Sequence, residues 1–310
     1  MLFILIFTLC GCKNLGVNNK VINKSGIYFD TLINITIYGI EDETIMDKCL
    51  SMCSDYEKMF SRTLENSEVS RINKASGEPV KVSKETIEVI KAGIQYSELS
   101  DGLFDITIAP VTELWDFHEN SNKVIPDSSD LEEAISHVSY KNIKIDYDES
   151  TVQLLDSKAE IDLGGIAKGY IADMLKEYLI SQGVKSAIIN LGGNIETIGL
   201  KPDNTPFRIG IKKPFDENEL LDEVLLNNKS VSSSGVYERY FYKDDILYHH
   251  IIDPRNGYPV ESDLYGVSII CDSSMEADAL GTICVLLGYE KGSKLIDSLD
   301  GVEAIWAFAE

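Results

Sequence analysis

Residues 160–173 read EIDLGGIAKGYIAD, and this segment guides the interpretation of the rest of the chain. Asp162 ends a predicted short strand, Gly164 and Gly165 follow, and apolar residues then recur at helical spacing. A strand, a glycine turn and a helix N-terminus direct backbone N–H groups and the positive end of the helix dipole at one point, which favours an anion. The alternative is a tight turn with a surface carboxylate, because glycine turns before helices are common.

A second segment, residues 274–282, reads SMEADALGT and predicts another helix start. Asp278 and Thr282 are four residues apart, so they share one face of that helix. A carboxylate and a hydroxyl are hard oxygen ligands, the type that Mg²⁺ takes beside a substrate phosphate. Together, the anion site and the metal site indicate a nucleotide or diphosphate ligand.

The composition indicates a large core and a strongly acidic surface. The chain has 310 residues, of which 44% are hydrophobic, and this is enough for one or two domains. Its 51 acidic and 28 basic residues give a net charge of -23. Because no run of Lys or Arg offsets this charge, we expect no nucleic acid among the partners of the protein.

The N-terminus has the pattern of a bacterial lipoprotein. Residues 2–9 form an apolar run that is too short to span a bilayer and resembles the core of a signal peptide, although no Lys or Arg precedes it. Leu9-Cys-Gly-Cys12 then resembles a lipobox. We expect a signal peptide over 1–12, a tether over 13–25 and a folded domain over 26–310. A lipid anchor on Cys12 would hold the protein to the extracytoplasmic side of the cell membrane; a buried first strand is the alternative.

Strand and helix patterns follow one another unevenly along the rest of the chain. Alternating or apolar runs predict strands, and amphipathic periodicity predicts helices. The predicted strands are 27–38, an apolar strand after Gly102, 143–147, 151–155, a strand–turn–strand over 187–199, 208–212, 230–235, 237–242, 248–253 and 266–271. The predicted helices are 43–60, 67–73, 83–100, a segment from Pro110, 131–138, 166–182, 275–287 and 290–297, and 216–223 is an acidic loop. This order favours an α+β fold over a doubly wound α/β fold.

Seven short motifs occur in a defined order along the chain. They are Phe29-Asp-Thr31, Gly102–Pro110 with Trp115, Asp162–Tyr170, Asn190–Asn194, Ser234–Arg239, His250–Gly257 and Glu276–Thr282. Each motif alone is a weak signal, but the set in this order is specific. From about Tyr28 to the C-terminus the chain resembles the ApbE family, the FAD:protein FMN transferases. One departure is that Phe29-Asp30 stands where the family usually has Met-Gly.

The resemblance implies a Mg²⁺-dependent enzyme that transfers FMN from its substrate FAD to a threonine or serine hydroxyl of an acceptor flavoprotein, releasing AMP. It also implies an ApbE-like α+β fold of mixed sheets with helices inserted, and a nucleotide site between two lobes. The metal would be held by Asp278, Thr282 and the carbonyl of Gly165. FAD would be contacted by Phe29, Leu103, Phe104, Asp105, Asp162, Lys168, Arg239 and Ile252. His250 would be the general base, since the unperturbed pKa of histidine lies near neutrality.

Alternatives remain open for the functions of single residues and for the function of the protein. His250 could instead cap a strand edge, and Arg239 could form a surface salt bridge. Asp253 is assigned a structural function, because it precedes the turn that Pro254 opens. The same site could hydrolyse FAD to FMN and AMP, or the protein could be a non-catalytic flavin-binding lipoprotein. Asp278 argues against the last, because a binding protein needs no metal between the phosphates.

Overall fold

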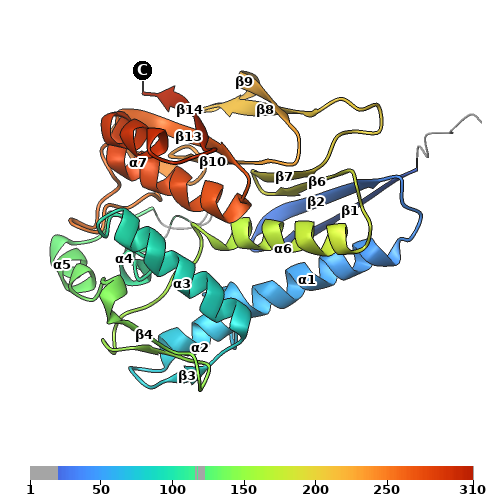
Figure 1. The fold of residues 1–310 in the computed structure, drawn as a ribbon. Helices are drawn as coiled ribbons and strands as arrows, with labels where there is room; N and C mark the ends of the chain where they lie inside the picture. Colours follow the sequence, from blue (N-terminus) through green and yellow to red (C-terminus); the bar gives the residue numbers. More distant parts are fainter. Residues whose placement is uncertain (1–19, 116, 118–122, 310) are drawn as a thin grey trace, which may run out of the picture.

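A seven-stranded sheet with the order β1-β2-β6-β7-β10-β13-β14 forms the centre of the molecule (Figure 1). The computed structural model describes residues 20–115, 117 and 123–309. The strands are Val21–Tyr28 (β1), Thr31–Tyr38 (β2), Ala187–Leu191 (β6), Asn194–Ile198 (β7), Ser230–Gly235 (β10), Leu264–Cys271 (β13) and Glu303–Phe308 (β14). Within the described residues the ladders are antiparallel rather than mixed, in keeping with the tight turns that join β1 to β2 and β6 to β7.

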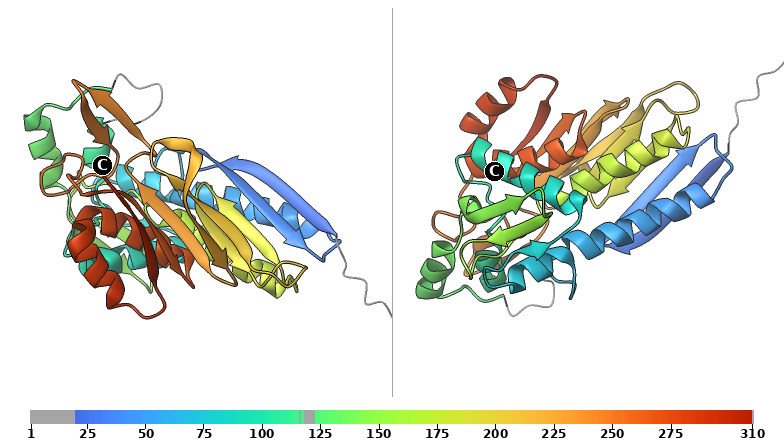
Figure 2. Two further views of the ribbon diagram at one scale, coloured as in Figure 1. Left: turned by 90° about the horizontal axis from the view of Figure 1, so that it is seen from above. Right: turned by 60° about the horizontal axis from the view of Figure 1, so that its bottom comes forward.

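Three helices cover one face of this sheet. They are α1 (Thr44–Phe60), α6 (Ala167–Ser181) and α7 (Ser274–Asp297), and they lie below the sheet in Figure 1 and across it in the right view of Figure 2. Strand β2 shows how the sequence directs side chains into this layer. Ile33, Ile35 and Ile37 alternate along it and are fully buried in the main core.

The β8–β9 hairpin, Phe207–Lys213 and Asp216–Leu226, packs against the opposite face of the sheet. Phe207 and Ile209 of β8 cluster there with Val231 and Ile270. The prediction of an acidic loop over 216–223 is therefore wrong. Its carboxylates indicated exposure to water, but a strand at the surface pairs through its backbone while its charged side chains stay in solvent.

Smaller elements gather beyond one end of the sheet (Figure 1). The helices are α2 (Glu68–Lys74), α3 (Lys84–Leu99), α4 (Ala109–Trp115), α5 (Ser128–Ser136) and the 3-10 turn η1 (Tyr140–Asn142). Strands β3 (Val80–Lys81), β5 (Thr151–Leu154) and β4 (Ile143–Asp146) form a small sheet, and β11 (Tyr240–Lys243) pairs with β12 (Ile246–His249). A second hydrophobic cluster joins α4, α5 and this last hairpin through Trp115, Leu131 and Phe241.

The first predicted strand is two strands. Residues 27–38 contain the end of β1, a turn and all of β2, because Phe29 and Asp30 adopt positive φ angles of 53° and 56° and reverse the chain. Strand β1 begins at Val21, so residues 21–25 belong to the sheet and not to the tether. The predicted signal peptide, the lipobox and residues 13–19 of the tether lie outside the described residues.

Two other predicted strands are loops. The segment after Gly102 and residues 160–162 meet only through an isolated parallel bridge between Ile108 and Glu160. Ile106 and Ile161 are nevertheless buried, at 2% and 0% exposure. An apolar run is buried in a loop as readily as in a strand, so its pattern alone does not separate the two.

Several further local features concern the helices and the cysteines. Ser83 caps α3 by accepting a hydrogen bond from the Thr86 N–H. Gly288, with φ of 71°, interrupts α7 between the two helices predicted over 275–287 and 290–297. The four described cysteines, Cys49, Cys53, Cys271 and Cys284, are buried and unpaired. Over the ranges that the structure describes, the helices are too short or too polar to cross a membrane.

Helices α6 and α7 cross at very short range. A Cβ placed on Gly169 of α6 would lie 2.3 Å from the carbonyl oxygen of Ser274, at the start of α7. The Gly169 N–H donates a hydrogen bond to the Asp278 carboxylate at 3.1 Å. Asp173 of α6 accepts hydrogen bonds from the N–H groups of Ser274 and Met275, at 2.7 and 3.0 Å. One helix therefore fixes the first turn of the other.

We expect Gly169→Ala to lower the free energy of unfolding by about 1–3 kcal/mol, because the added methyl group meets rigid backbone rather than a flexible side chain. Urea unfolding measures this change. The matched control is Gly292→Ala in α7, where the nearest atoms are the ring of Trp306 at 3.2 Å and the loss should be smaller. Equal stability of Gly169→Ala and the wild type would show that the crossing tolerates a wider spacing.

Candidate functional site

One cavity of about 450 Å³ contains every residue that the sequence assigned to the site. It lies where the main core meets the second cluster, since Phe104 belongs to the first and Ile252 to the second. Its lining includes Phe29, Leu103, Phe104, Asp105, Asp162, Gly165, Lys168, Arg239, His250, Ile252, Asp278 and Thr282. Folding thus brings together segments that are distant in sequence, whereas the function of each residue stays a prediction.

The N-terminus of α6 opens into this cavity. Gly164, Gly165 and Lys168 line it, and Ile166, which precedes the helix, provides no side-chain cap. A Cβ on Gly165 would lie 2.9 Å from the ring of Phe104, so glycine is needed at this position. In the first turn, the Ala167 N–H donates to the Leu163 carbonyl at 2.9 Å and the Gly169 N–H to the Asp278 carboxylate at 3.1 Å. The feature that suits an anion here is therefore the positive end of the helix dipole, reached through a glycine turn.

Asp162 is already engaged by protein groups. Its carboxylate accepts a hydrogen bond from the Gly164 N–H at 2.8 Å and pairs with Arg62 at 3.0 Å. Arg62 also pairs with Glu113 at 2.8 Å. Asp162 therefore shapes the glycine turn at the cavity wall. Arg62 lines the cavity but was not predicted, because nothing in its polar loop distinguishes it from other surface residues.

Asp278, Thr282 and Gly165 place oxygen donors close together. A Cβ on Gly165 would lie 3.5 Å from the hydroxyl oxygen of Thr282, so the glycine turn and α7 face each other. Asp278 is 4% exposed and is oriented by the N–H of Gly169. Across the described part of the chain, no group of three or more His, Cys, Asp or Glu could hold a metal alone. One carboxylate with a hydroxyl and a carbonyl fits Mg²⁺ that takes its remaining oxygens from a ligand.

The loop that carries Leu103 and Phe104 is held by Asp105. Its carboxylate accepts hydrogen bonds from the N–H groups of Thr107 and Tyr140, both at 2.8 Å. Burial raises the pKa of this carboxyl, and the hydrogen bonds from Thr107 and Tyr140 oppose the shift. The geometry gives Asp105 a structural function, which is to hold the two apolar side chains against the cavity.

The turn between β1 and β2 brings Phe29 and Thr31 to the cavity. The Phe29 N–H donates a hydrogen bond to the Glu57 carboxylate at 2.6 Å, which ties the turn to α1. Phe29 packs on the main core, so its ring is held at the cavity edge. The departure from Met-Gly at this position therefore keeps an apolar side chain in the same place.

Lys168 and Arg239 bring positive charge into the cavity of an acidic protein. Neither forms an ion pair with any other described residue, so the salt bridge considered for Arg239 does not occur there. Glu238 also lines the cavity. Its surroundings raise the pKa of the carboxyl by desolvation, Lys168 lowers it, and Asp278 raises it again. Glu238 lies within the Ser234–Arg239 motif, yet its charge gave no reason to place it in an anion site.

His250 lies beside Arg239, and its backbone N–H donates to the Arg239 carbonyl at 3.1 Å. Its Nδ1 atom is buried and has no hydrogen-bond partner within the described residues. Burial, aided by the positive charge of Arg239, lowers the pKa of His250 to about 3. The expectation of a pKa near neutrality is wrong, because desolvation disfavours the charged ring. The neutral ring is still the form that accepts a proton.

The sequence model of the ApbE family matches residues 29–306, a range that includes the whole lining of this cavity. This chain belongs to the ApbE family. Its fold is similar to that of the ApbE protein of Thermotoga maritima, with a TM-score of 0.86 and 32% identity over 93% of this chain and 94% of that one. The flavin transferase ApbE from Vibrio cholerae gives a TM-score of 0.82 at 27% identity, over 93% and 97% of the two chains. The α+β, ApbE-like fold is thereby confirmed.

Similar ApbE sequences carry the name FAD:protein FMN transferase. The protein from Klebsiella pneumoniae (strain 342) is 35% identical over 93% of this chain and 90% of its own length. The protein from Treponema pallidum (strain Nichols) is 30% identical over 99% of this chain and 90% of its own length. The similarity extends over nearly the whole of each protein, so it includes every part of the site.

Proposed function

We propose that this ApbE-family chain is an FAD:protein FMN transferase. It moves FMN from FAD to a threonine or serine hydroxyl of an acceptor flavoprotein and releases AMP. Support comes from the similar proteins of that name and from one feature of the cavity. Asp278 and Thr282 lie opposite the N-terminus of α6, with Lys168 and Arg239 in the same lining. Oxygen donors for a metal, the positive end of a helix dipole and cations are the combination that a diphosphate requires.

Mg²⁺ is the metal that we propose. Asp278, Thr282 and the Gly165 carbonyl would hold it, and when bound it would neutralise charge on the diphosphate as a Lewis acid. Asp278 supplies the negative charge of this set. The N–H of Gly169 holds its carboxylate in place, so α6 contributes to the metal site as well as to the anion site.

Side chains of this protein would accept the proton of the acceptor hydroxyl and pair with the negative charges of the diphosphate. The acceptor oxygen forms a bond to the FMN phosphorus, the bond from that phosphorus to the bridging oxygen breaks, and AMP leaves with that oxygen. His250, neutral in the free site, takes the proton of the attacking hydroxyl. Lys168 and Arg239 pair with phosphate oxygens, and the positive end of the α6 dipole faces the same charge.

Hydrolysis of FAD to FMN and AMP is the second candidate, because water could take the place of the acceptor hydroxyl in the same cavity. The two reactions are separated by incubating the protein with FAD, Mg²⁺ and a folded acceptor domain, and by measuring AMP and the intact mass of the acceptor. We expect one FMN on the acceptor for each AMP released, and none on an acceptor whose target threonine is replaced by valine. AMP without modified acceptor would identify a hydrolase. No AMP at all would identify a flavin-binding protein.

Asp278→Asn should reduce Mg²⁺-dependent turnover by at least about 100-fold, because the neutral amide is a poor ligand for Mg²⁺. Asparagine is preferable to alanine here, since its amide oxygen still accepts the hydrogen bond from Gly169 and the fold is preserved. Turnover as a function of Mg²⁺ concentration measures the effect. Glu276→Gln removes the same charge from the same helix outside the cavity and should leave turnover unchanged. Ordinary turnover by Asp278→Asn would remove Asp278 from the metal site.

His250→Ala should slow transfer by about 10²–10⁴-fold, the range for loss of a positioned general base, with little change in FAD affinity. Because the lowered pKa leaves His250 neutral above about pH 4, the wild-type rate should not rise through the pKa of free imidazole; it should fall only in acid. Rates at saturating FAD from about pH 5 to 8 measure both effects. His137→Ala, outside the cavity, is the control. A wild-type step near pH 6.5 that His250→Ala abolishes would contradict the low pKa.

We also propose, from the lipobox alone, that a lipid on Cys12 anchors the protein to the extracytoplasmic side of the cell membrane. Cys12→Ala should leave an unprocessed chain that carries no lipid and is larger than the mature protein by the length of the signal peptide. Membrane fractionation and intact mass measure both properties. Processing of Cys12→Ala to the wild-type size would refute the anchor.

A further inference from the structure

The β11–β12 hairpin joins the nucleotide cavity to an exposed surface. Arg239 precedes β11 and His250 follows β12, so both ends of the hairpin are at the cavity. One of its faces is buried, where Phe241 stacks on Tyr248 with ring centroids 5.3 Å apart. Because neighbouring residues of a strand face opposite sides, the other face carries side chains that this core does not use.

The other face of the hairpin carries Tyr242 and Tyr240, which are the first two of four aromatic rings that lie in a row. We name this row the aromatic strip: Tyr242, Tyr240, Phe215 and Tyr265. The first three are 60%, 39% and 39% exposed. Successive ring centroids are 5.8, 5.1 and 5.0 Å apart, and each pair meets edge to face. The strip therefore crosses from the hairpin to the turn between β8 and β9 and on to β13. Exposed, contiguous apolar surface on a soluble domain marks an interaction site, and tyrosine is enriched among residues that contribute most to binding.

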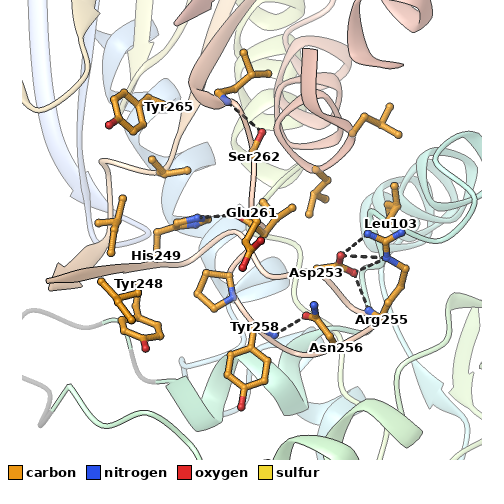
Figure 3. A pocket seen from close by; sticks show the side chains of 18 of the residues that line it. Leu103, Tyr248, His249, Asp253, Arg255, Asn256, Tyr258, Glu261, Ser262 and Tyr265 are labelled. Atoms are coloured by element: carbon orange, nitrogen blue, oxygen red, sulfur yellow. Dashed lines mark hydrogen bonds and ion pairs between the residues drawn. The ribbon is translucent and has the colours of Figure 1, made fainter. Parts of the chain in front are cut away.

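The strip ends at a second cavity of about 890 Å³, drawn in Figure 3. Tyr265 and His249 line this cavity, and His249 is the residue next to His250 of the nucleotide cavity. Leu103 and Leu286 belong to the lining of both cavities, so the two share a wall. The second cavity therefore adjoins the nucleotide cavity.

We propose that the aromatic strip and the second cavity form the docking surface for the acceptor flavoprotein. This inference rests on the proposed function, which requires a protein to bring a hydroxyl to His250 while FAD occupies the nucleotide cavity. The strip includes Tyr240, the residue next to Arg239 of the nucleotide cavity, and together with the second cavity it gives the partner an area to bind beside the nucleotide cavity. The aromatic rings are uncharged, so an acidic partner meets less repulsion there than elsewhere on a chain of net charge -23.

Tyr242→Ser tests the docking surface without touching the nucleotide cavity, because Tyr242 lies outside its lining. With the acceptor domain used above as the probe, we expect KM for the acceptor to rise about tenfold or more, while kcat, FAD affinity and release of AMP with water stay within about twofold. Tyr240→Ser, with a less exposed ring, should act in the same direction. The matched control is Tyr147→Ser, since Tyr147 is also 60% exposed, follows β4 and lines neither cavity.

Three results would overturn the inference. The first is an unchanged KM for the acceptor in both Tyr242→Ser and Tyr240→Ser. The second is a rise in KM with Leu32→Ser instead; this residue is 61% exposed and forms part of another apolar surface near the cavity. The third is a change from dimer to monomer in Tyr242→Ser by light scattering, which would assign the strip to a second copy of this chain. If the wild type releases AMP but modifies no acceptor, the proposed function itself fails and the docking surface fails with it.

Discussion

The close crossing of α6 and α7 is the contact on which the site depends. Gly169 lets the two backbones approach, and Asp173 holds the first turn of α7 through the N–H groups of Ser274 and Met275. The N-terminus of α6 and the Asp278 carboxylate consequently face one another. A wider spacing would separate the anion site from the metal site, and a diphosphate needs both at once.

Electrostatics within the cavity oppose those of the protein as a whole. The chain has a net charge of -23, which alone would repel a dinucleotide. Lys168 and Arg239 face the cavity without carboxylate partners in its lining, and Arg62 is bound to Asp162 and Glu113 at its edge. Burial, together with the same local positive charge, keeps His250 neutral. Positive charge in the cavity therefore favours an anion and an unprotonated His250 at the same time.

Patterns in the sequence predicted the structure correctly where a short segment determines its own conformation. The glycine turn before α6 and the break of α7 between its two predicted helices were both predicted, because each depends on backbone geometry that neighbouring residues impose. Predictions from these patterns were wrong where tertiary contacts determine the secondary structure. The acidic residues 216–223 form a strand because β8 is available to pair with them. The segment after Gly102 is a loop because the Asp105 carboxylate accepts hydrogen bonds from the backbone N–H groups of Thr107 and Tyr140.

The sequence by itself determined the family, the α+β fold and a set of residues that all line the site, although not Arg62 and Glu238, since the motifs occur as contiguous blocks in a defined order. Only the tertiary structure decided the environment of those residues. Asp278 is buried, Asp105 is taken up by its own loop, and His250 has a low pKa because it is desolvated beside Arg239. Burial and charge at a side chain depend on atoms from distant parts of the chain, and no local pattern contains them.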